Sequence, residues 1–158
     1  MIKGRSKNPL ILIFVLIFMS SCNNGVVFTD AMTMSEKTWK LTDVPSFNVQ
    51  ITDTSVNNNI FFIIRTGTSY PFRNIYLFVT TSSPDGISRT DTLQYYLADE
   101  KGDWYGKGFG DIHELNLPFR TNVFFPVKGT YQFKIQHGMR IEDLKGVYDF
   151  GLRVEKNR

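Results

Sequence analysis

Apolar and polar residues alternate with a period of two along much of this 158-residue chain. Such a period places every second side chain on the same face of an extended strand. Between residues 129 and 135, for example, Tyr131, Phe133 and Ile135 fall on one face. The segments predicted as strands on this basis are 47–51, 75–81, 87–97, 112–119, 129–135 and 148–154. No long stretch has the period of about 3.6 residues that is typical of an amphipathic helix.

Two further features help to order these strands. Residues 60–65 are an almost continuous apolar run, which is typical of a central strand covered on both faces. The turn that follows 75–81 contains Pro84, which presets φ, and Gly86, which accepts positive φ. This turn predicts a hairpin between 75–81 and 87–97.

The strands and turns together predict an all-β fold, an antiparallel β-sandwich of about seven to nine strands. The pattern disfavours a parallel α/β sheet, because such a sheet needs long amphipathic helices between its strands. The sandwich domain is expected to span 43–158. Residues 29–42 carry Trp39 as their only large aromatic residue and show no clean period, so 22–42 is interpreted as an N-terminal tether and irregular segment.

The first residues have the layout of a secretory signal peptide. Lys3, Arg5 and Lys7 form a basic stretch, and the ten residues 10–19 are all apolar. A transmembrane helix needs about 20 apolar residues, so this run is too short to span a bilayer. Residues 1–21 are therefore predicted to be a cleaved signal peptide.

Cys22 is the only cysteine of the chain and directly follows the predicted signal. Residues 19–22, Met-Ser-Ser-Cys, resemble the lipobox of a bacterial lipoprotein, whose cysteine is acylated through its thiol. The alternative is an ordinary signal followed by a free thiol, which is a liability in an exported protein. We interpret Cys22 as the lipidation site and expect several acyl chains there, because one chain anchors a protein only marginally.

The net charge of +3 belongs to the predicted signal peptide. Its three basic residues would be removed on processing, which leaves 15 Lys and Arg against 15 Asp and Glu. A neutral mature chain lacks the excess of basic residues that is typical of nucleic-acid binding. We therefore expect the membrane, through acylated Cys22, and other envelope proteins as partners, and no nucleic acid.

The sequence contains little that indicates catalysis or metal binding. Asp111 and His113 would share one face of a strand, but Zn²⁺ needs three or four ligands and the other histidine, His137, is distant. Both histidines are interpreted as surface or half-buried residues. No Gly-x-Ser-x-Gly elbow is present, and the only cysteine is assigned to lipid. No catalytic residue, metal site or cofactor is predicted.

Gly106, Gly108 and Gly110 stand at alternate positions. They are similar to a phosphate-binding loop in composition only, because no Lys-[Ser/Thr] pair follows them. In a strand-like segment, such glycines more often mark a bulge or let a backbone or a Trp ring pack closely.

Aromatic residues are the remaining candidates for function, since twelve Phe, seven Tyr and two Trp follow the predicted signal. Most are expected to fill the sandwich core. Tyr70, Phe72, Trp104 and Phe109 lie beside turns and glycines, which makes them the better candidates for a partner surface. An exposed subset of aromatic residues suits either a protein interface or a sugar-binding platform.

Several segments of the chain also match a known pattern in combination. They are YPFRNIYLFV (70–79), DTL (91–93), LADEKGDWYGKG (97–108), GDI (110–112), FPVKGTYQF (125–133) and GLRVEK (151–156). Together they resemble the GldH family, the gliding-motility lipoproteins of the Bacteroidetes, over nearly the whole mature chain. The resemblance implies a non-enzymatic accessory lipoprotein of the cell envelope that works with other gliding proteins and the type IX secretion system. It implies no catalytic residues.

Two other classes of function stay open from the residues alone. A lipid-anchored glycan-binding module would present a flat row of exposed aromatic side chains on one sheet face. An enzyme would need a concave pocket that joins Asp111, His113 and a third polar group.

The residues after the predicted anchor bear on the location of the protein. Asn23 and Asn24 stand where an Asp tends to hold lipoproteins at the inner membrane. The acidic cluster that sends Bacteroidetes lipoproteins to the cell surface is missing from this stretch. We therefore expect the periplasmic leaflet of the outer membrane.

Overall fold

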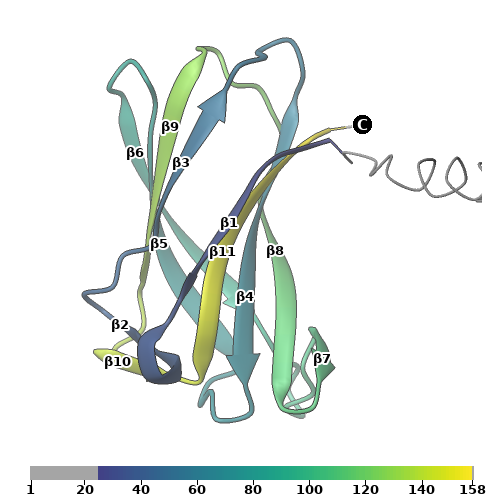
Figure 1. Ribbon diagram of the computed structural model, residues 1–158. Coiled ribbons are helices and arrows are strands. Elements are labelled where there is room, and N and C mark those ends of the chain that lie inside the picture. The colour runs from purple at the N-terminus through teal and green to yellow at the C-terminus, as the bar shows by residue number, and fades with distance from the viewer. Residues whose placement is uncertain (1–24, 158) are drawn as a thin grey trace, which may run out of the picture.

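The computed structural model describes residues 25–157, which fold into antiparallel strands arranged as a sandwich (Figure 1). The strands are β1 (Val26–Thr33), β2 (Thr38–Lys40), β3 (Ser46–Ile51), β4 (Asn58–Gly67), β5 (Asn74–Ser82), β6 (Ser88–Tyr96), β7 (Lys107–Phe109), β8 (Ile112–Val123), β9 (Gly129–His137), β10 (Asp143–Lys145) and β11 (Val147–Lys156), with a single 3-10 turn, η1 (Ser35–Lys37). Among these residues, eight strands have six or more residues and three have only three. The predicted all-β sandwich is confirmed.

Two larger sheets make up the layers of the sandwich (Figure 1). The first has the strand order β1-β11-β4-β8-β7 and the second has the order β3-β9-β5-β6. Strands β2 and β10 form a small third sheet at the lower end of the molecule in Figure 1. Every paired neighbour is antiparallel. Only β5 with β6 and β7 with β8 are successive strands joined by a short turn, which requires that direction.

The core lies between the inner faces of the two larger sheets. The alternation predicted from the sequence produces it, because each strand turns every second residue inward. The second sheet contributes Phe47, Val49, Ile51, Ile75, Leu77, Val79, Tyr131, Phe133 and Ile135, all at most 4% exposed. Phe62 and Phe150 face them from the first sheet, with their ring centroids 5.4 Å apart.

Strand β4 is central, as predicted, because it pairs with β11 on one side and β8 on the other. Only one of its faces is fully buried. Ile60, Phe62 and Ile64 are at most 2% exposed, whereas Phe61 and Ile63 on the outer face are half-buried. The prediction of burial on both faces was therefore wrong, because a two-layer antiparallel sandwich leaves one face of each sheet towards solvent.

The predicted hairpin is confirmed. Strands β5 and β6 pair from Asn74 with Tyr96 to Ser82 with Ser88. Gly86 closes the turn with a φ of 87°, a conformation that side chains with a Cβ rarely adopt.

The expectation of an irregular segment over 22–42 was wrong within the described residues. Strand β1 pairs with β11 from Val26 to Thr33, so the sandwich begins well before residue 43. Five of the eight β1 residues are exposed, which explains why the strand has no hydrophobic period. The backbone ladder with β11 holds this edge strand along its whole length, whereas only Val27 and Phe28 at its start pack against the core.

The predictions for residues 1–24 concern a part of the chain outside the described residues. They include the signal peptide 1–21 and the lipidation site Cys22. Between residues 25 and 157, no helix has both the length and the apolar content needed to cross a bilayer.

Candidate interaction surfaces

Three of the four predicted surface aromatics come together in one cluster. The Tyr70 ring centroid lies 6.0 Å from that of Phe72 and 6.1 Å from that of Trp104. Trp104 in turn stacks on His113, at 5.2 Å and an interplanar angle of 8°. The fourth residue, Phe109, lies in β7, and its side chain is outside the described part of the structure.

Tyr70 occupies the interior of this aromatic cluster. It is 5% exposed, and its hydroxyl donates a hydrogen bond of 2.9 Å to the Asn74 carbonyl. Burial raises the pKa of the phenol well above its ordinary value. The expectation that Tyr70 belongs to a surface was wrong, because the loop that carries it folds over the sandwich end and packs against Gly146. Phe72 and Trp104 are half-buried.

The alternating glycines bring β7 close to β8. A Cβ at Gly106 would lie 2.6 Å from the Glu114 carbonyl oxygen, and one at Gly108 would lie 2.5 Å from that of Ile112. These contacts confirm the interpretation of close backbone packing for Gly106 and Gly108, whereas Gly110 has no atom near its Cβ position and adopts a positive φ of 66°.

Neither histidine is placed for metal binding. His113 lies in the stack with Trp104, and no group of three His, Cys, Asp or Glu in residues 25–157 is arranged to hold a metal ion. His137 is completely buried, so the expectation of a surface or half-buried residue was wrong for it. It packs edge-on against Trp39, with ring centroids 5.5 Å apart. The small β2–β10 sheet explains this burial, because it carries Trp39 and covers the end of β9.

A second apolar surface, which the sequence analysis did not single out, lies along β5. We call it the β5 surface and define it by Phe72, Tyr76, Phe78, Met139 and Ile141. Tyr76, Phe78 and Ile141 are 39%, 42% and 37% exposed. An open groove of about 660 Å³ runs between β5 and the loop after β9, and all of these residues except Phe78 line it.

The loop after β9 is held against β5 by close contacts. The Tyr76 amide donates to the Met139 sulfur at 3.4 Å. A Cβ at Gly138 would lie 3.0 Å from the Phe78 ring, so glycine lets the loop approach. A sequence signal for this surface existed, because Tyr76 and Phe78 are large aromatic residues on the face of the alternation that points away from the core.

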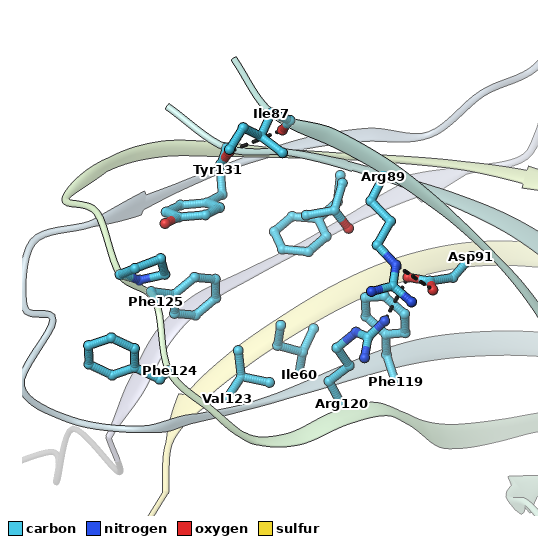
Figure 2. Close-up of a pocket in the computed structure, with 14 residues that line it drawn as sticks. Ile60, Ile87, Arg89, Asp91, Phe119, Arg120, Val123, Phe124, Phe125 and Tyr131 are labelled. Atoms are coloured by element: carbon cyan, nitrogen blue, oxygen red, sulfur yellow. Dashed lines mark hydrogen bonds and ion pairs between the residues drawn. The ribbon is translucent and has the colours of Figure 1, made fainter. Parts of the chain in front are cut away.

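A third feature is an apolar pocket of about 460 Å³ between β6 and the end of β8 (Figure 2). Its walls are largely aromatic and branched aliphatic. Arg89, Asp91 and Arg120 lie at one side of it. The Asp91 carboxylate accepts from Arg120 Nη2 at 2.8 Å and lies 3.2 Å from Arg89 Nε.

Comparison with known proteins gives consistent matches. The family model of the GldH lipoprotein matches residues 26–154. A curated protein of Flavobacterium johnsoniae, "Gliding motility lipoprotein GldH", is 33% identical, over 96% of this chain and 98% of that protein. A "Gliding motility lipoprotein GldH homolog" of Christiangramia forsetii is 32% identical, over 93% of this chain and 94% of that protein.

A solved structure of carbohydrate-binding modules from the β-sandwich superfamily is also similar, at 13% identity and a TM-score of 0.29. That match covers 87% of this chain and 58% of the other, and a score this low has no bearing on function. Both curated relatives match almost the whole chain, and the family model matches most of it. The chain therefore belongs to the GldH lipoprotein family.

Proposed function

We propose that this protein is a non-enzymatic accessory component of gliding motility and the type IX secretion machinery. The observation that supports the proposal best is the 33% identity, over nearly the full length of both chains, to a gliding motility lipoprotein. As a member of the GldH lipoproteins, the chain is a lipid-anchored protein of the cell envelope. The non-enzymatic role in gliding motility and type IX secretion is our proposal.

The proposed anchor is acylated Cys22, and the proposed location is the periplasmic leaflet of the outer membrane. Asn23 and Asn24 support this location, because neither an inner-membrane Asp nor an acidic surface signal follows the cysteine. Several acyl chains on one cysteine would hold the domain stably at the membrane, which one chain alone does not achieve. Anchoring concentrates a neutral domain beside membrane partners.

The proposed protein contact is the β5 surface. Contiguous exposed apolar residues rimmed by polar ones are typical of interaction sites. Phe72 links this surface to the aromatic cluster. Phe72 and Trp104, which the sequence predicted as partner-surface residues, are therefore proposed as contacts at the side of the β5 surface. The buried ring of Tyr70 contacts the rings of Phe72 and Trp104 and supports both.

Co-purification from envelope membranes tests the proposal. A tagged wild-type chain is compared with Cys22→Ala and with the double variant Tyr76→Ser, Phe78→Ser. Gln94→Ala, next to Tyr76 on the paired strand, is the matched control. Recovery of other motility or secretion components by the wild type and the control, with loss in the double variant, would support the proposal. Recovery of lipid alone by the wild type would contradict it.

A glycan-binding module is the second candidate, and one observation favours it. Tyr76, Phe78 and Tyr96 all point outward from the same sheet, and Tyr96 is 53% exposed. The Arg73 guanidinium lies 5.4 Å from the centre of the Tyr96 ring. Such rows of rings suit the apolar faces of sugars. Affinity electrophoresis with envelope polysaccharides separates the candidates, because Tyr96→Ala should abolish retardation by glycan and leave protein co-purification intact.

A further inference from the structure

The chain enters the sandwich at the same end as the apolar pocket. Across the first sheet, Glu155 pairs with Val26, Lys156 with Asn58, and Asn58 with Val123. The ends of β1, β11, β4 and β8 are therefore in line, as the upper end of the molecule in Figure 1 shows. The pocket is lined partly by the last residues of β8 and the loop that follows it.

The distances involved are short. Three strand spacings separate β1 from β8, which is about 14 Å in all. Cys22 precedes Val26 by four residues, and four extended residues reach at most about 14 Å. A lipid on Cys22 would thus hold this end of the sandwich, rather than the opposite one, close to the bilayer.

The pocket has the chemistry of an acyl-chain site. Its volume of about 460 Å³ falls within the usual range for small-molecule sites. Ile60, Phe119, Val123 and Phe125 provide an apolar wall (Figure 2).

Two large apolar residues at the rim of the pocket face solvent. Ile87 is 69% exposed and Phe124 is 59% exposed. They come from different strand connections, the β5–β6 turn and the β8–β9 loop. Water is a poor environment for either side chain, and the interior of a bilayer is a favourable one.

The mouth of the pocket carries an excess of positive charge. Arg89 and Arg120 share the single carboxylate of Asp91, whose side chain is 15% exposed. Arg89 uses Nε and Arg120 uses Nη2 in these contacts, so both guanidinium groups keep further N–H donors. Guanidinium groups bind phosphate oxygens through such donors.

We propose that this end of the sandwich faces the bilayer and that the pocket accepts an acyl chain of an anionic membrane phospholipid. Ile87 and Phe124 enter the apolar layer, and Arg89 and Arg120 bind the phosphate. The orientation rests on the proposed anchor at Cys22. A phospholipid explains the pocket better than a second copy of the chain does. The apolar wall suits its acyl chain, and the arginines suit its phosphate. The proposed anchor also brings this end of the sandwich close to the bilayer.

Fluorescence quenching by brominated phospholipids tests the contact. The protein is the mature chain, residues 22–158, with Cys22→Ser, so that no lipid of its own is present. Phe124→Trp should be quenched by vesicles of phosphatidylcholine and phosphatidylglycerol with brominated acyl chains. Tyr105→Trp is the matched control, because Tyr105 is 64% exposed and lies near β7 at the opposite end. Equal quenching of both variants, or of neither, would overturn the proposal.

Vesicle sedimentation then separates apolar from ionic contributions. The double variant Ile87→Ser, Phe124→Ser should weaken partitioning at least about tenfold, while Tyr105→Ser leaves it unchanged. Arg89→Gln should remove the preference for vesicles that contain phosphatidylglycerol over pure phosphatidylcholine. Thermal melting of each variant shows whether the sandwich is intact, and Phe124→Trp gives an independent readout if the double variant fails to fold.

Two results would reject the lipid site. One is a lipid-free chain that does not bind either vesicle. The other is a dimer in solution that Phe124→Ser dissociates, which would assign the pocket to a second copy. Neither result affects the co-purification of motility or secretion components, so failure of this inference is distinguishable from failure of the proposed function.

Discussion

Single residues in the interior determine how the protein responds to pH, and His137 is the clearest case. Burial lowers the pKa of its imidazole below the ordinary value of 6.5 and outweighs the nearby backbone groups of Glu142 and Trp39. The folded state therefore holds the ring neutral when the unfolded chain already binds a proton. Stability is complete above about pH 6.5 and falls as the pH drops below that value, until the folded-state pKa is reached.

We predict that the melting temperature of the wild type falls between pH 7 and pH 5 more steeply than that of His137→Phe. Phenylalanine keeps an aromatic ring against Trp39 and does not titrate. Differential scanning calorimetry across this window measures the difference in slope. Asp53 does not interfere, because hydrogen bonds from Ser55 lower its pKa from 3.8 to about 2, and its contribution is lost only below that window. Parallel slopes for the two proteins would contradict the prediction.

Tyr70 gives a second test at the residue scale, because the structure makes it part of the core. Tyr70→Phe removes the hydrogen bond to the Asn74 carbonyl and should lower the free energy of unfolding by about 1 kcal/mol. Tyr70→Ala also removes the ring and should cost about 3–5 kcal/mol. Urea denaturation measures both changes, with Tyr105→Phe as the exposed control. Loss of partner recovery in Tyr70→Ala at unchanged stability would instead restore Tyr70 as a contact residue.

Among the elements, β1 is the one whose role depends most on a distant partner. Its ladder with β11 joins residues that are more than 100 positions apart. Gly151 of β11 allows the close approach of β1, since a Cβ at this position would lie 2.8 Å from the Asp30 carbonyl oxygen. A small residue on β11 therefore lets the edge strand lie flat against its neighbour.

We predict that Gly151→Ala displaces β1 and lowers the free energy of unfolding by about 1–3 kcal/mol. Hydrogen exchange at the amides of β1 should become faster in the variant. Thr29→Ala, on an exposed position of the same strand, should change stability by less than about 0.5 kcal/mol. Unchanged exchange in Gly151→Ala would mean that β1 does not depend on this contact.

For the whole molecule, anchoring and folding should be separable. The described sandwich begins at β1, four residues after Cys22, so the lipid proposed on Cys22 would set the location of the domain without adding to its core. The apolar pocket lies at the opposite end from the aromatic cluster, and the β5 surface, which shares Phe72 with that cluster, lies on an outer face. A partner can therefore reach the β5 surface while the pocket end faces lipid.

We predict that a chain with an ordinary cleavable signal in place of residues 1–21 and with Cys22→Ser is released from membranes by washing without detergent and keeps its melting temperature, because only the weaker contacts of the pocket end then hold it at the bilayer. The signal is then removed as usual, and no thiol remains to receive lipid. Membrane fractionation and circular dichroism measure the two effects. The same replacement with Cys22 retained should also be released by washing without detergent, because a lipobox is required for acylation. A soluble variant that has lost its fold would show that the lipid supports the sandwich.

The sequence by itself determined the class of fold and much of its local order. The alternation at Ile75, Leu77 and Val79 sets which side chains enter the core, and Pro84 with Gly86 sets the hairpin. The same pattern placed Tyr76 and Phe78 outside. These features follow from steric preferences and from side-chain periods within a few residues, so they can be predicted without knowing the partner strand.

Only the tertiary structure decided which residues are covered and which distant residues meet. It buried Tyr70 within a loop that folds over the sandwich end and His137 beneath a small sheet. It also paired β1 with β11, although β1 has no hydrophobic period. It also assembled the apolar pocket from separate strands, which no local pattern predicts. The physical reason is that burial depends on what packs against a residue, and that neighbour is brought by chain closure over long separations in sequence.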